Sequence, residues 1–135
     1  MNFDRDTAEH VFGGKGRTVR FEDPEHFGAG WLRGNHIWID TPNGFTFSAT
    51  WNLGTYCTAG RIDWEAPGPI MQQKPPPTSP NAEVAFWRDG SGGMIAINGD
   101  TVIGYITPER LLTAIEAAER NDEAAIIVAL TEDDE

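Results

Sequence analysis

The sequence has little cysteine, little positive charge and no long hydrophobic run. Its single cysteine, Cys57, can form no disulfide within the chain, whereas small secreted domains often depend on several. Ten Lys and Arg stand against 21 Asp and Glu, a net charge of −11 that disfavours nucleic acid and anionic membrane. No stretch approaches the roughly 20 apolar residues that span a bilayer, and residues 1–6 lack the apolar core of a signal peptide. We therefore expect a cytoplasmic protein that binds neither nucleic acid nor membrane.

Residue patterns for metal binding and catalysis are also missing. The three histidines do not have the i, i+4 spacing of a zinc-binding helix, and one cysteine supplies no thiolate pair. Residues 13–18 combine glycines with two cations, but they do not match a P-loop and they precede a predicted strand. Cys57 has no neighbouring base that would activate it as a nucleophile. We expect no cofactor, no metal site and no catalytic residues, and therefore a protein that is not an enzyme.

The chain has enough length and aromatic residues for one hydrophobic core. Five Trp and seven Phe are present among 135 residues, and each buried aromatic removes about 150–250 Å² from water. Residues 1–17 mix charges with glycines and show no periodicity, which predicts a flexible arm. Residues 18–130 are interpreted as a single α+β domain with a proline-rich loop at 66–82, and residues 131–135 as an acidic tail.

Alternation of apolar and polar residues predicts antiparallel strands in the first half of the domain. Residues 18–22 alternate and should form a half-buried strand. Residues 36–40 and 45–51 are two β-rich runs joined by a turn that contains Pro42 and Gly44, which predicts a hairpin. We also consider short strands at residues 31–32 and 61–64.

The second half predicts a β-meander followed by helices. Its strands are expected at residues 83–88, 94–97 and 101–106, with an Asn-Gly turn before the last of them. Thr107 is a suitable N-cap, with Pro108 at the first helical position, for a helix that continues to residue 119. Residues 124–130 suit either a short helix or a strand. The hairpin and the meander would form one sheet or a small sandwich, followed by one or two C-terminal helices.

Aromatic residues outside the predicted strands are the candidates for binding. Trp31 and Trp64 lie in glycine- and proline-rich surroundings, where an exposed indole could anchor a partner. Arg61 lies close to Trp64, and the loop before it carries Tyr56, so Trp31, Tyr56, Arg61 and Trp64 form the predicted binding set. The remaining tryptophans fall inside predicted strands, where core packing is the simpler interpretation; they are Trp38, Trp51 and Trp87.

Several segments resemble a class of small uncharacterised proteins encoded by actinobacteriophages. Residues 44–48, followed by Tyr56, Cys57 and Arg61, are similar to a glycine turn, a strand and a Tyr-Cys segment of that class. Residues 83–87 and 102–109 are similar to its final strands and following helix. The resemblance is patchy and covers about residues 44–118. It implies a phage-encoded protein that acts in the bacterial host cytoplasm, and it carries no activity with it.

These observations leave three hypotheses about function. The leading one is a non-enzymatic phage-type accessory protein that binds a bacterial host protein. The second is a protein that binds or sequesters a small molecule, such as a nucleotide or a signalling ligand, through its aromatic and arginine-bearing loops. The third is an acidic mimic of a polyanion. The oligomeric state is left open.

Overall fold

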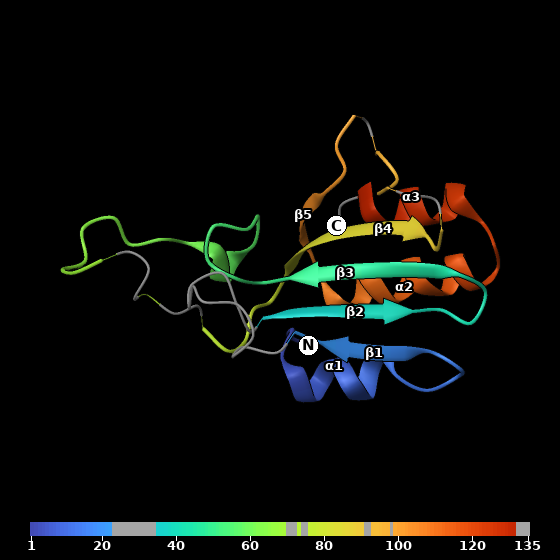
Figure 1. Ribbon diagram of the computed structural model, residues 1–135, viewed down its shortest axis with the longest axis horizontal. Helices are drawn as coiled ribbons and strands as arrows, with labels where there is room; N and C mark the ends of the chain where they lie inside the picture. The colour runs from blue at the N-terminus through green and yellow to red at the C-terminus, as the bar shows by residue number, and fades with distance from the viewer. Residues whose placement is uncertain (23–34, 70–72, 74–75, 91–92, 98, 132–135) are drawn as a thin grey trace.

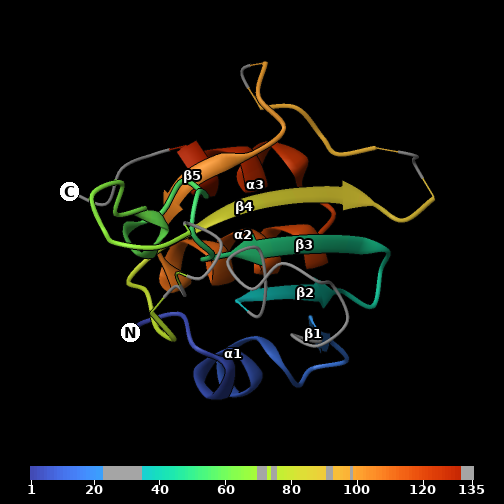
Figure 2. The same cartoon turned by 60° about the vertical axis from the view of Figure 1, so that its left-hand side comes forward.

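The computed structural model describes residues 1–22, 35–69, 73, 76–90, 93–97 and 99–131. Its strands form one antiparallel sheet in sequence order (Figure 1). They are β1 (Thr18–Phe21), β2 (His36–Asp40), β3 (Phe45–Thr50), β4 (Ala82–Arg88) and β5 (Ile103–Ile106). Helices α2 (Pro108–Glu119) and α3 (Glu123–Thr131) cover one face of the sheet, and α1 (Arg5–Phe12) lies beside β1 (Figures 1 and 2). This is the predicted α+β fold.

The predicted hairpin is confirmed, and its turn also contacts a helix. β2 pairs with β3, and Gly44 has a φ of 95°, a left-handed conformation that glycine adopts without strain. The Asn43 amide donates a hydrogen bond of 2.8 Å to the carbonyl oxygen of Ala118. The turn therefore adds a further hydrogen bond to a carbonyl group at the C-terminus of α2, which also accepts one of 2.8 Å from the Asn121 N–H.

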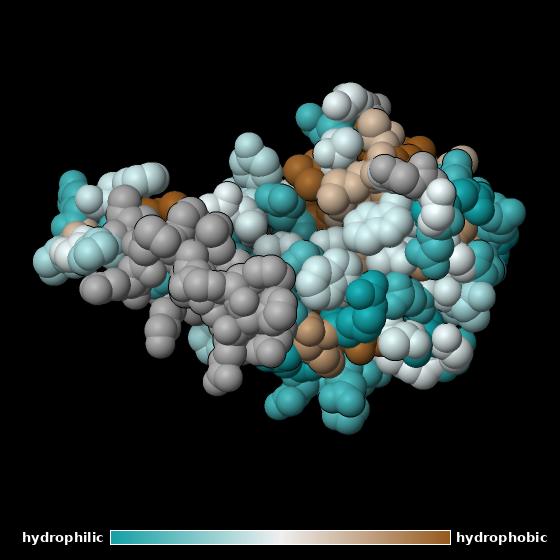
Figure 3. Space-filling view, in the orientation of Figure 1, coloured by the Kyte–Doolittle hydropathy of each residue, from teal (hydrophilic) through white to brown (hydrophobic). Residues whose placement is uncertain are grey.

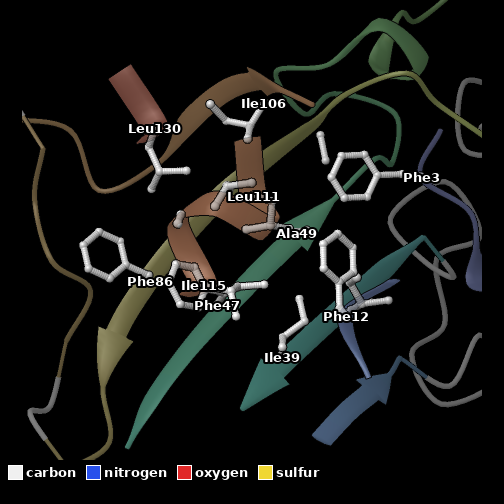
Figure 4. Close-up of a cluster of buried hydrophobic side chains, with 14 of the residues drawn as sticks. Phe3, Phe12, Ile39, Phe47, Ala49, Phe86, Ile106, Leu111, Ile115 and Leu130 are labelled. Carbon is white, nitrogen blue, oxygen red and sulfur yellow. The ribbon is translucent and has the colours of Figure 1, made fainter. Parts of the chain in front are cut away.

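The core lies between the sheet and the helices. Phe47 of β3 and Phe86 of β4 stack with their ring centroids 5.5 Å apart. Leu111 and Ile115 of α2 and Leu130 of α3 pack over the same face of the sheet (Figure 4). Burial of these large apolar side chains is the main force that holds the two layers together.

Both C-terminal segments are helical. Thr107 is the predicted N-cap of α2, and its hydroxyl accepts a hydrogen bond from the Arg110 N–H. The segment at 124–130, for which helix and strand were both open, is part of α3. It buries Ile126 and Leu130, which are four residues apart and so share one helix face.

The prediction of a flexible arm at residues 1–17 is wrong. Asp4 caps α1 by accepting a hydrogen bond of 2.7 Å from the Thr7 N–H, and the helix buries Ala8 and Phe12. Phe3 is also buried and stacks on Trp51, with a centroid separation of 5.5 Å. Three apolar residues among many charged ones are a weak sequence signal, but they are sufficient for this short helix to join the core.

The predicted strand at residues 94–97 is also absent. β5 pairs directly with β4 through an irregular register, with Ala82 opposite Ile106 and Val84 opposite Ile103. Ile97 and Asp100 form an isolated bridge with two backbone hydrogen bonds, but among the described residues the pairing extends no further. Residues 61–64 form no strand, and residues 31–32 lie outside the described residues.

Candidate binding surfaces

The predicted binding residues that the structure describes are exposed, but they do not form one site. Trp31 lies outside the described residues. The side chain of Trp64 is 72% exposed and that of Tyr56 is 62% exposed. Arg61 and Trp64 line one surface hollow of about 490 Å³, which Tyr56 does not line. The predicted set therefore separates into the Arg61–Trp64 pair and a separate Tyr56.

Trp64 is carried by a loop that extends from the body of the protein. Residues 61–69, called here the Trp64 loop, form the green segment at the far left of Figure 1, which comes forward in Figure 2. The Gln73 side chain braces this loop, because its amide donates to the Asp63 carbonyl at 2.7 Å and its oxygen accepts from the Asp63 N–H at 3.1 Å. The Asp63 carboxylate also accepts from the Glu65 N–H at 3.1 Å. Hydrogen bonds at Asp63 and Glu65, the residues before and after Trp64, thus hold the turn that presents the indole.

The residues before the Trp64 loop are tightly packed. A side chain at Gly60 would place its Cβ 2.1 Å from the Thr55 carbonyl oxygen, so only glycine fits there without movement of the backbone. Cys57 is buried, and its Sγ lies 3.3 Å from the Thr55 hydroxyl oxygen. The N–H of Thr58 donates to the Asn81 side chain at 2.6 Å. Cys57 therefore has a packing role at the base of the loop.

Tyr56 is attached to the outer edge of the sheet beside a second exposed tyrosine. Its carbonyl oxygen accepts a hydrogen bond of 2.9 Å from the Tyr105 N–H, and its own N–H donates to the Glu83 carboxylate at 2.8 Å. A Cβ at Gly104 would lie 2.5 Å from that of Tyr56, so glycine is required for this contact. Tyr105 has a φ of 59°, a conformation that is strained for a bulky residue.

The sheet face opposite the helices carries a polar and aromatic cluster that the sequence analysis missed. Arg20 makes two hydrogen bonds to Asp40, at 2.7 and 3.2 Å, and its guanidinium lies 5.4 Å from the centroid of the Trp38 ring. The His36 ring is 4.0 Å from that of Trp38, and its Nε2 lies 2.6 Å from the Ser48 hydroxyl oxygen. Trp38 is thus half-buried here instead of lying in the predicted core.

Trp87 is likewise only half-buried, whereas Trp51 is fully buried as expected. The strand register places Arg20, Trp38 and Ser48 in one row across the sheet. Alternation along each strand could have located these residues on the face away from the core. Their alignment could not be read from the sequence, because it depends on which strands are neighbours.

The fold shifts the pKa values within this cluster. Burial lowers the pKa of His36 to about 4, and the positive charge of Arg20 adds to the shift. Burial alone would raise the pKa of Asp40, but hydrogen bonds from Arg20 and Thr46 outweigh it and the pKa is lowered. His36 is therefore neutral at pH 7 and a weak base, which suits a hydrogen-bonded structural pair with Ser48 better than general-base catalysis.

Comparisons with known proteins do not extend these observations. Searches of family models, of curated proteins and of solved structures found no match to the chain. Among the described residues, no group of three or more His, Cys, Asp or Glu side chains could hold a metal ion. None of the described helices has the length and apolar character needed to cross a membrane.

Proposed function

We propose that this chain is a non-catalytic binding protein that contacts another protein through the Trp64 loop. The observation that carries the proposal is an indole that is 72% exposed on a braced, projecting loop. Tryptophan is among the residues that most often dominate the free energy of protein–protein binding. Because the loop is already held in place, it would lose less conformational entropy when it binds.

The surroundings of Trp64 suit a protein interface with this indole at its centre. Arg61, Asp63 and Glu65 are all exposed beside the indole, so an apolar anchor is surrounded by charges of both signs. Interfaces commonly have this pattern of an apolar centre and a polar rim. The resemblance to actinobacteriophage proteins makes a bacterial host protein the proposed partner.

Polyanion mimicry is supported less well by the charges of the folded body. Three of its carboxylates are already paired with arginine side chains, at separations between 2.6 and 2.9 Å. They belong to Asp40, Glu119 and Glu123. A mimic needs carboxylates that are free to meet a basic groove, so these pairs reduce what the body could offer.

A pull-down from bacterial lysate, followed by measured affinities, tests the Trp64 loop. The wild-type chain should retain a specific partner that Trp64→Ala loses, and the purified pair should show binding weakened by about 2 kcal/mol or more. Tyr105→Gly is a matched control, because it removes another exposed aromatic from a position whose φ suits glycine. Equal binding by the wild-type and Trp64→Ala chains would refute this role for the loop.

A further inference from the structure

A second hollow lies at the end of β4, away from the Trp64 loop. It has a volume of about 450 Å³ and is lined by Trp87, Arg88, Gly90, Gly93 and Met94. Small-molecule sites commonly have volumes of about 300–1,000 Å³ and walls of aromatic and apolar side chains with few polar groups. The hollow has the size and the lining of such a site.

Apolar side chains continue from the hollow along the edge of the sheet. Met94 is 48% exposed. Its neighbour Ile95 is half-buried, as are Val102, which precedes β5, and Ile103, the first residue of β5. Figure 3 shows hydrophobic residues gathered at the top of this face, over β5 and its connection from β4. Apolar surface that lies beside a hollow commonly marks a binding site.

Arg88, the charged group among the described residues that line the hollow, is already paired. Arg88 donates to the Glu123 carboxylate at 2.9 Å and to the Asn121 side chain at 2.9 Å. Its guanidinium also lies 4.4 Å from the centroid of the Phe45 ring. These contacts leave Arg88 poorly placed to bind an anion, and the net charge of −11 repels anions from the protein as a whole.

We infer that this hollow binds a small, uncharged aromatic molecule. The Trp87 indole and the Met94 thioether would supply the apolar contacts, and sulfur–aromatic contacts are themselves favourable. The glycines at positions 90 and 93 allow a flat ligand to approach the backbone closely. The site is separate from the Trp64 loop, so the two proposals can fail independently.

Fluorescence titration of the full-length chain with N-phenyl-1-naphthylamine tests the site with an uncharged aromatic probe. We expect saturable binding of one probe per chain. Met94→Glu should weaken it at least tenfold, because it places a charge in the apolar wall. Val128→Glu is the matched control, since Val128 is 47% exposed on α3 and the change adds the same charge elsewhere. That variant should bind the probe like the wild type.

A second variant, Gly93→Phe, is designed to fill the hollow while the side chains of Trp87 and Met94 stay in place. The position of a Cβ at Gly93 has no heavy atom within 4 Å, so Gly93→Phe should be accommodated and should also weaken binding at least tenfold. The anionic probe 8-anilino-1-naphthalenesulfonate should bind at least tenfold more weakly than the uncharged one. Probe binding that does not saturate, that survives both Met94→Glu and Gly93→Phe, or that is equally strong for the anion would overturn the inference.

Discussion

His36 is a titratable residue whose chemistry is set by its neighbours on the sheet. It is half-buried between the Trp38 ring and the Ser48 hydroxyl, and burial lowers its pKa from 6.5 to about 4. Between these two pH values the unfolded chain carries a proton on His36 and the folded chain does not. The unfolded state therefore binds more protons, and the free energy of unfolding falls as the pH falls through this range.

A comparison of wild type with His36→Gln should isolate this contribution. We expect the wild type to lose roughly 2 kcal/mol more than the variant between pH 7 and pH 5, as measured by urea unfolding. The variant keeps the carboxylates and the other histidines, so their titration cancels in the comparison. Equal losses for the two proteins would mean that His36 in the folded state keeps the ordinary pKa of a histidine side chain.

Arg17 shows how burial changes the effect on folding stability of breaking an ion pair. Its side chain is 4% exposed and binds Glu119 of α2 through two hydrogen bonds, at 2.6 and 3.1 Å. Arg20 makes a similar pair with Asp40, but its side chain is 52% exposed. Removing one member of a buried pair leaves a charge with poor solvation, whereas exposed pairs contribute little to stability.

We therefore expect Arg17→Met to lower the free energy of unfolding by about 2–3 kcal/mol, and Arg20→Met by about 1 kcal/mol or less. Urea unfolding at pH 7 measures both. The double variant Arg17→Met with Glu119→Gln should recover part of the loss, since it also removes the carboxylate left without its partner. A larger effect from Arg20→Met than from Arg17→Met would contradict this ranking.

At the scale of elements, α1 has an effect on stability that its sequence does not suggest. Phe12 is buried, and its ring lies 6.1 Å from that of Phe3, which in turn stacks on Trp51 at the end of β3. The helix thus extends the core beyond the part that α2 and α3 cover. A flexible arm would contribute nothing to stability.

Phe12→Ala should lower the free energy of unfolding by about 3–4 kcal/mol, because it removes a fully buried aromatic side chain and leaves a cavity. Thermal or urea unfolding measures the loss. His10→Ala on the exposed side of the same helix is the control, with an expected change of about 0.5 kcal/mol or less. Similar stability of the two variants would mean that α1 does not pack as described.

Elements with strong local signals could be predicted, and those that depend on distant contacts could not. The turn at Gly44 and the cap at Thr107 are encoded by a few neighbouring residues, so the hairpin and α2 were predicted closely. The Asn-Gly turn before β5 has an equally strong local signal, but the strand expected before it did not form because β5 pairs directly with β4. Trp64 was identified by its sequence surroundings, whereas the polar row across the sheet required the strand order.

For the whole molecule, the net charge of −11 produces a long-range repulsion, which the arginine–carboxylate pairs of the described residues offset in part. Raising the salt concentration from about 10 to about 100 mM shortens the Debye length from about 30 to about 10 Å. We expect the midpoint of urea unfolding at pH 7 to rise over this range, since long-range repulsion is screened first. A fall in the midpoint would show that attractive pairs outweigh the repulsion.

The contact between Arg17 and Glu119 joins residues that are 102 positions apart in the chain. The pairings of the five described strands, by contrast, each join strands that follow one another in the sequence. During synthesis the sheet can therefore grow strand by strand, while the N-terminal segment that emerges first must wait for Ser79, its backbone partner at Phe3, and then for α2. Phe3 would lack its backbone partner until Ser79 is made, and Arg17 would lack Glu119 until α2 is made. Nascent chains that stop before α2 should therefore be the form of this protein that chaperones bind and that aggregates most readily.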